Sequence, residues 1–177
     1  NLDDAADKIR ISKTLDLAAS CSSDNSVLVF ASIYDEFLDK LKHEGGYVIE
    51  GEDKEKLQRV LWHDGHLNAG IVAQHAVNIT GQAGIDLPEG KQFLIVPETG
   101  TGPDYPFSGE KLTVTMALYK VKDIDEAIAL TNSIQAYQGQ GHSCGIYSNN
   151  DDNIMKLALA TRTSRVMVNQ PQSASNS

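Results

Sequence analysis

The sequence predicts an α/β domain in which helices form α/β/α layers around a mostly parallel sheet. Short apolar runs, such as Ser26–Ala31 and Phe93–Val96, have the length and composition of strands buried on both faces. Stretches with helical spacing separate these runs, so strands and helices alternate and imply crossover connections. With 177 residues, 41% of them hydrophobic, the chain is long enough to form one domain with its own core.

The first half of the chain contains four predicted helices and two short strands. A helix over residues 3–19 opens with acidic residues, which favour the positive end of the helix dipole. After the strand Ser26–Ala31, an amphipathic helix over Tyr34–His43 stops at Gly45-Gly46. The remaining elements are a short strand at 47–49, a helix capped by Asp53 that runs to about Trp62, and a helix over 71–82.

The second half begins with the strand Phe93–Val96 and a long loop at 97–109, which holds three prolines and three glycines. Asp123 and Glu126 form a capping-box start for a helix over 124–137. Other expected elements are strands at 113–121, 142–148 and 165–169, a helix at 152–161 and a polar loop at 170–177. Ligands of open α/β sheets bind beyond the carboxyl ends of strands, which points to loops 97–110 and 170–177.

Composition excludes several function classes. The net charge of −9 argues against nucleic-acid binding, which usually needs a basic face. The longest apolar run, Val27–Ala31, is far too short to cross a membrane, and residues 1–26 show no charged-then-apolar pattern of the signal-peptide type. Two cysteines do not make a disulfide scaffold. We therefore expect a cytoplasmic chain with reduced thiols and no membrane or nucleic-acid partner.

Individual residues say little when taken alone. Cys21 lies between small residues, where another molecule could approach its sulfur, yet a buried structural cysteine is the commoner case. His142 follows Gly139-Gln140-Gly141 and could be a base or only a hydrogen-bonded structural histidine. Glu110, at the end of the long loop, could accept ribose hydroxyls or act as a base. His63 and His66 lack a visible third metal ligand, so no metal site is predicted.

Four segments, in order, resemble the aldehyde dehydrogenase superfamily and especially its CoA-acylating branch, which includes acetaldehyde, propionaldehyde and sulfoacetaldehyde dehydrogenases. Residues 12–26 resemble the catalytic-cysteine segment, and Gly109 to Leu112 resemble its E-K-L segment. Residues 139–143 resemble G-x-G-H-T/S, a mark of the acylating branch, and 165–171 resemble the following strand and N-x-P turn. There are departures: Leu17-Ala18 and Thr113-Val114 stand where Asn-Gly and Ser-Pro are common.

The resemblance implies a role for each matched residue. Cys21 would be the nucleophile that attacks the aldehyde and carries the acyl group as a thioester. Its backbone N–H would contribute to an oxyanion hole. Glu110 would bind the nicotinamide ribose of NAD or NADP, and His142 would be the active-site histidine. CoA would take the acyl group. Asn169, Gln170 and Ser173, in and after the last strand, would border the pocket for a small or polar aldehyde such as acetaldehyde or sulfoacetaldehyde.

The same resemblance implies that residues 1–177 are a single catalytic, cysteine-bearing domain or fragment. A nucleotide-binding domain is expected upstream, outside these residues, and the full-length enzyme is expected to be a homo-oligomer. We expect the isolated chain to fold but to turn over slowly or not at all.

Three alternatives stay open at this point. The chain could come from a hydrolysing, non-acylating aldehyde dehydrogenase, in which water takes the acyl group. It could be a non-catalytic assembly domain with an inert Cys21. It could also use Cys21 and Cys144 as a redox pair, although no motif places them together.

Overall fold

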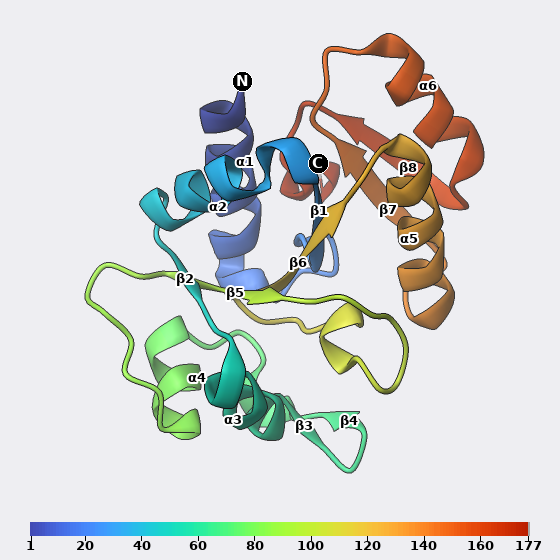
Figure 1. The fold of residues 1–177 in the computed structure, drawn as a ribbon. Coiled ribbons are helices and arrows are strands. Elements are labelled where there is room, and N and C mark those ends of the chain that lie inside the picture. Colours follow the sequence, from blue (N-terminus) through green and yellow to red (C-terminus); the bar gives the residue numbers. More distant parts are fainter. Residues whose placement is uncertain (177) are drawn as a thin grey trace.

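The computed structural model describes residues 1–176, with the backbone alone for 175 and 176; Ser177, the end of the predicted tail, lies outside the described residues. Four parallel strands form the central sheet in the order β1-β6-β5-β2. Their bounds are β1 (Ser26–Phe30), β2 (Gly46–Val48), β5 (Phe93–Pro97) and β6 (Thr115–Val121). The parallel sheet among helices confirms the predicted α/β class (Figure 1).

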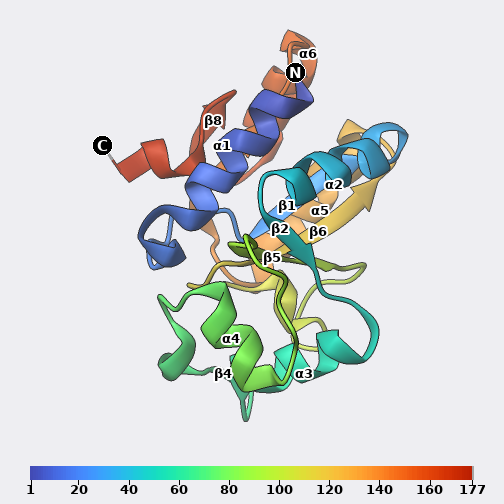
Figure 2. The same ribbon diagram turned by 90° about the vertical axis from the view of Figure 1, so that its left-hand side faces the viewer.

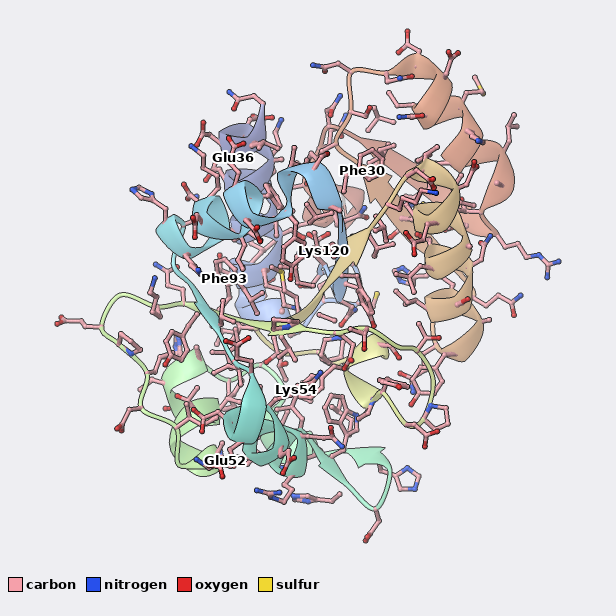
Figure 3. All side chains as sticks on the ribbon, viewed as in Figure 1. Phe30, Glu36, Glu52, Lys54, Phe93 and Lys120 are labelled. Atoms are coloured by element: carbon pink, nitrogen blue, oxygen red, sulfur yellow. The ribbon has the colours of Figure 1, made fainter. Side chains whose placement is uncertain are left out.

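The core surrounds the two inner strands, β5 and β6. Nearly every residue of both strands is buried, as expected for apolar strands covered on both faces. The helices α1 (Leu2–Thr14) and α2 (Tyr34–His43) lie together at one end of the molecule. The pair α3 (Gly51–Leu61) and α4 (Ala76–Ala83) lies at the other end (Figures 1 and 2). Phe93 on β5 is fully buried between these ends (Figure 3).

One ion pair joins α3 to the end of the central sheet. Lys54 Nζ lies 3.0 Å from Glu98 Oε2 and donates to Pro97 O at 2.9 Å. The same ammonium lies 5.8 Å from the ring centre of Phe107, whose ring meets Trp62 edge-on. Lys54, labelled in Figure 3, therefore holds the start of the long loop against α3.

A second, smaller sheet completes the chain. The strands β7 (Gly141–Ile146) and β8 (Thr163–Val168) pair in parallel, and α6 (Asp151–Ala160) connects them. The helix α5 (Ile124–Tyr137) precedes β7, and Asp123 caps it by accepting from Glu126 N, as predicted. A hairpin of β3 (Trp62–His63) and β4 (His66–Leu67), which the sequence did not predict, carries the two neighbouring histidines.

Several predicted boundaries are wrong. The helix expected over 3–19 ends at Thr14, because Asp16, Leu17 and Ala18 take positive φ angles of 48°, 55° and 58°. The helix expected over 71–82 begins only at Ala76, after a 3₁₀ turn at Ala69–Ile71. The tail expected as a loop forms a 3₁₀ helix over Gln172–Asn176. Other 3₁₀ segments are Leu15–Ala18, Ala31–Ile33 and Pro106–Ser108.

The N-terminus of α3 also differs from the prediction. The helix starts at Gly51, with Glu50 in the cap position and no side-chain cap bond. Asp53, expected as the cap, instead forms an ion pair with Lys56 inside the first turns. Among the described helices, none has the length and hydrophobicity needed to cross a bilayer.

Candidate functional site

Cys21 lies in a tight turn that connects α1 to β1. Ser23 N donates to Ser20 O at 3.1 Å, which closes the turn around Cys21, and the hydroxyls of Ser20 and Ser22 are 2.9 Å apart. The thiol is free and exposed. The Cys21 N–H donates to no acceptor within the described residues, so it is available to a ligand bound beside the sulfur.

Glu110 lies at the end of the long loop, just before β6. Its side chain is exposed, and it forms no ion pair within the described residues. Its backbone N–H donates to Gln138 Oε1 at 2.8 Å. The loop is therefore held through its backbone, and the carboxylate is left free to accept hydrogen bonds from a ligand.

His142 opens β7 after a turn in which Gly139 and Gly141 take φ angles of +98° and +81°. These angles favour glycine, which explains the Gly-x-Gly pattern before the histidine. His142 N donates to Gly139 O at 3.0 Å, and the ring Nδ1 lies 3.2 Å from Ser143 Oγ. The imidazole is exposed, with its other nitrogen directed to no protein partner within the described residues.

All three residues line one cavity of about 420 Å³. The cavity also runs along β1 and β7, between α1 and α5, and each of these strands has a hydrogen-bonded partner on one side only within the described residues. Cys21 precedes β1, Glu110 precedes β6 and His142 begins β7. The candidate residues thus gather at the amino ends of strands. The two loops expected at the site also contribute to it, because Ser108, Gly109 and Glu110 of loop 97–110 and Gln172 of loop 170–177 line the cavity.

The tail contributes differently from the prediction. Asn169, Gln170 and Ser173 are absent from the described lining of the cavity, whereas Gln172 belongs to it. The Asn169 side chain is engaged elsewhere: it accepts from Ser148 N at 2.9 Å and donates to Ser148 O at 2.8 Å. Gln170 accepts from Tyr147 through its carbonyl. Gln172 begins the 3₁₀ helix of the tail, and the path of the chain into this helix, which the sequence alone does not reveal, brings its amide to the cavity.

Buried charges beneath the Cys21 turn were missed by the sequence reasoning. Lys13 and Lys111 are both 0% exposed, and the Asp24 carboxylate has one buried, unbonded oxygen. Burial lowers the pKa of Lys13 to about 7 and raises that of Asp24 to about 6. Lys13 follows Ala5 and Ile9 at intervals of four, which places it on the buried face of α1 and was the available signal.

The second cysteine and the histidine hairpin have their own surroundings. Cys144 is a free thiol, 3.8 Å from the hydroxyls of Thr161 and Thr163. His63 and His66 face each other across the β3–β4 hairpin. The described residues contain no group of three or more His, Cys, Asp or Glu side chains that could hold a metal ion.

No family model matches the chain. Individual relatives do. The chain is 41% identical over 171 residues to the acylating sulfoacetaldehyde dehydrogenase of Cupriavidus necator, covering 96% of this chain and 35% of the relative. It is 35% identical to an aldehyde-alcohol dehydrogenase of Clostridium acetobutylicum, covering 96% of this chain and 20% of the relative.

Among solved structures, an acetylating aldehyde dehydrogenase from Geobacillus thermoglucosidasius superposes with a TM-score of 0.96 at 34% identity, covering 98% of this chain and 38% of that one. Fold and sequence together place the chain in the aldehyde dehydrogenase superfamily. The Cupriavidus relative is an acylating enzyme and the Geobacillus structure an acetylating one, which favours the CoA-acylating branch and gives the hydrolysing alternative no support. The chain spans about a third of the length of the sulfoacetaldehyde dehydrogenases that it matches.

Proposed function

We propose that this chain is the cysteine-bearing catalytic segment of a CoA-acylating aldehyde dehydrogenase. The observation that carries the proposal is the convergence of Cys21, Glu110 and His142 on one cavity, from positions separated by up to 121 residues. These are the three residues singled out by the motif resemblance. A structural cysteine with no role would not require a free exposed thiol beside both other motifs.

In the proposed reaction, the Cys21 thiolate attacks the aldehyde carbon and forms a thiohemiacetal. The Cys21 N–H is placed to stabilise the oxyanion beside the sulfur. Loss of hydride leaves an acyl thioester on Cys21, and the thiol of CoA then attacks its carbonyl and releases the cysteine. His142, exposed at the same cavity, is the residue suited to accept the proton of the incoming thiol.

A nicotinamide dinucleotide, when bound, supplies the hydride acceptor. The described residues fit its ribose end, because the Glu110 carboxylate is exposed, unpaired and able to accept from two adjacent hydroxyls. The chain has no G-x-G-x-x-G phosphate motif. We therefore propose that an upstream nucleotide-binding domain holds the rest of the cofactor, and that residues 1–177 alone are inactive or nearly so.

We further propose a small, polar aldehyde as the substrate, with sulfoacetaldehyde as the first candidate. Two acylating sulfoacetaldehyde dehydrogenases, at 41% and 36% identity, support this choice. The buried Gln172 amide in the cavity wall adds a polar group. The full-length enzyme should prefer sulfoacetaldehyde over propionaldehyde in kcat/KM, and a clear preference for longer alkyl aldehydes would count against the choice.

A cytoplasmic homo-oligomer is our proposal for the full-length enzyme, and light scattering would test its assembly.

The first test is the reactivity of the cysteines in the folded chain. Brief iodoacetamide treatment followed by intact mass measurement should give one fast adduct, which disappears in Cys21→Ala and persists in the matched Cys144→Ala variant. Adducts on Cys144 alone, or none before denaturation, would contradict an accessible nucleophile at Cys21.

The second test uses the full-length enzyme with aldehyde, NAD or NADP, and CoA. The product should be an acyl-CoA thioester, and Cys21→Ala should lower kcat by at least about 10³-fold because the covalent route is lost. His142→Asn should lower the rate of the CoA-dependent step more than hydride transfer. A free acid as the main product in the presence of CoA would overturn the acylating assignment.

A further inference from the structure

The segment that carries Glu110 is anchored by side chains from two other parts of the fold. Glu110 N donates to Gln138 Oε1 at 2.8 Å, and the next backbone N–H, that of Lys111, donates to Asn25 Oδ1 at 3.0 Å. The buried Lys111 Nζ donates to Phe107 O at 2.6 Å and Gly109 O at 2.7 Å. The backbone N–H groups of Glu110 and Lys111 therefore bind side chains from two different parts of the fold. The Lys111 ammonium also fixes the backbone of the preceding turn through the carbonyls of Phe107 and Gly109.

Asn25 connects this segment to the nucleophile. It follows Cys21 by four residues, and its Nδ2 donates to Ser23 O at 3.4 Å within the Cys21 turn. Its own carbonyl accepts from Ala117 N at 3.0 Å, which fixes Asn25 to β6 of the central sheet. One side-chain amide therefore links the Cys21 turn to the Glu110 loop across 86 residues of sequence.

Gln138 connects the same segment to the histidine. It ends α5 and directly precedes the Gly139–His142 turn, which the bond from His142 N to Gly139 O closes. Gly109 makes room for its side chain: a Cβ at Gly109 would collide with Gln138 Oε1 and lie 3.0 Å from its Cδ. Because Gly109 has an ordinary negative φ, the glycine serves the close approach of Gln138 and no special backbone angle.

We propose that Asn25 and Gln138 are positioning residues that set Glu110 relative to Cys21 and His142. The inference rests on the proposed function, in which Glu110 binds the nicotinamide ribose. Because side-chain amides accept from the N–H groups of both Glu110 and Lys111, the backbone of this loop has little freedom to move. Glu110 must be held in one position if the nicotinamide is to lie at a productive distance from the Cys21 sulfur.

Gln138 gives the cleaner test, because its bond to Glu110 is exposed and water can replace it with little loss of stability. In the full-length enzyme, Gln138→Met keeps the size of the side chain and removes the acceptor. Gln138→Glu restores an acceptor oxygen. The same change at an exposed glutamine outside the cavity, Gln82→Met on α4, is the matched control.

We expect Gln138→Met to raise the KM for the dinucleotide about tenfold, the change that corresponds to one charge-neutral hydrogen bond. The KM values for aldehyde and CoA should stay within about twofold, and the melting temperature within about 2 °C. Gln138→Glu should recover most of the dinucleotide affinity, and Gln82→Met should match the wild type.

Asn25→Asp, which keeps the acceptor for Lys111 but loses the donor to Ser23, should slow alkylation or acylation of Cys21 with the dinucleotide KM little changed.

An unchanged dinucleotide KM in Gln138→Met, or equal damage in Gln138→Glu, overturns the inference while the proposed function stands. If the wild-type enzyme forms no acyl-CoA, or Cys21→Ala keeps full activity, the proposed function falls and the inference falls with it. If the melting temperature of Gln138→Met falls by clearly more than about 2 °C together with its activity, the result would also count against positioning. Such a fall would indicate that Gln138 has a purely structural role.

Discussion

The two parallel sheets of this chain differ sharply in how well they are covered. In the central sheet, β5 and β6 are buried almost throughout, and Phe93, Leu94 and Ile95 are 0% exposed. In the second sheet, β7 and β8 have half-buried and exposed residues along their whole length. On α6, between them, Met155 and Leu159 are 60% and 80% exposed.

This contrast separates stability from function in the chain. The central sheet supplies most of the buried apolar surface, and hydrophobic burial is the dominant favourable term in folding. The second sheet supplies His142 and one wall of the cavity, with much less burial to hold it. The candidate site therefore combines Cys21 and Glu110, which border the well-packed central sheet, with His142, which lies on the less buried second sheet. Three predictions test how far this division extends.

The largest expected effect is the difference between truncating an apolar side chain in the central sheet and truncating one on the helix beside the second sheet. Phe93→Ala on β5 removes a fully buried ring and should lower the free energy of unfolding by about 3–5 kcal/mol. Leu159→Ala on α6 removes an exposed side chain and should change it by less than about 0.5 kcal/mol. Urea unfolding of both variants measures this, and similar losses in the two would break the comparison.

An intermediate effect should come from the buried charges, which make the well-packed half sensitive to pH. Between pH 4 and 6 the folded chain keeps Asp24 protonated, whereas the unfolded chain releases the proton, so stability falls as pH rises. Between pH 7 and about 10 the unfolded chain holds a proton on Lys13 that the folded chain lacks, so stability rises with pH. These two groups therefore place a minimum of stability between pH 6 and 7, roughly 2–3 kcal/mol below the stability at pH 4.

Lys13→Met combined with Asp24→Asn tests the origin of this minimum. The fall on the acid side should disappear, because its titrating group is gone. A weaker rise on the alkaline side should remain, because burial also lowers the pKa of Lys111 well below its usual value. Urea unfolding at several pH values provides the measurement, and an unchanged minimum in the double variant would assign the pH dependence to other groups.

The smallest effect concerns the backbone before Cys21. Ala18 is fully buried with a φ of +58°, in the left-handed region that costs a non-glycine residue about 1 kcal/mol or more. Ala18→Gly should therefore raise the free energy of unfolding by about 0.5–1 kcal/mol, after the entropy of the new glycine is counted. Ala5→Gly, in the helix α1, should lower it by a similar amount. A loss of stability in Ala18→Gly would argue that this turn is not left-handed in solution.

The backbone geometry before Cys21 bears on one departure from the family pattern, the Leu17-Ala18 pair that stands where Asn-Gly is common. Both residues occupy positive φ angles, which asparagine and glycine tolerate best. The chain therefore keeps the left-handed turn with residues that disfavour it. The strain lies three residues before Cys21, in the segment that leads into the Cys21 turn.

The alternation of strands and helices could be predicted from the residues alone, because apolar spacing and caps act within a few residues. Ser26–Phe30, Phe93–Pro97 and the Asp123 cap appear in the structure close to their expected places. The family motifs at Cys21, Glu110 and His142 were also recognisable, because each is local in sequence. The end of α1 and the start of α4 were not, since left-handed residues at 16–18 and at Ala73 interrupt the helical spacing there.

The assembly of the candidate site could not be predicted in this way, because it depends on the three-dimensional packing of the chain. That the three motifs meet at the amino ends of strands depends on which strands become neighbours. The roles of Asn25, Gln138 and Gln172 depend on contacts with residues 27 to 86 positions away. The burial of Lys13 beside Asp24 depends on the packing of α1 under the Cys21 turn. Such contacts follow from the path of the whole chain, because hydrogen bonds and charges act across space while sequence patterns report only their near neighbours.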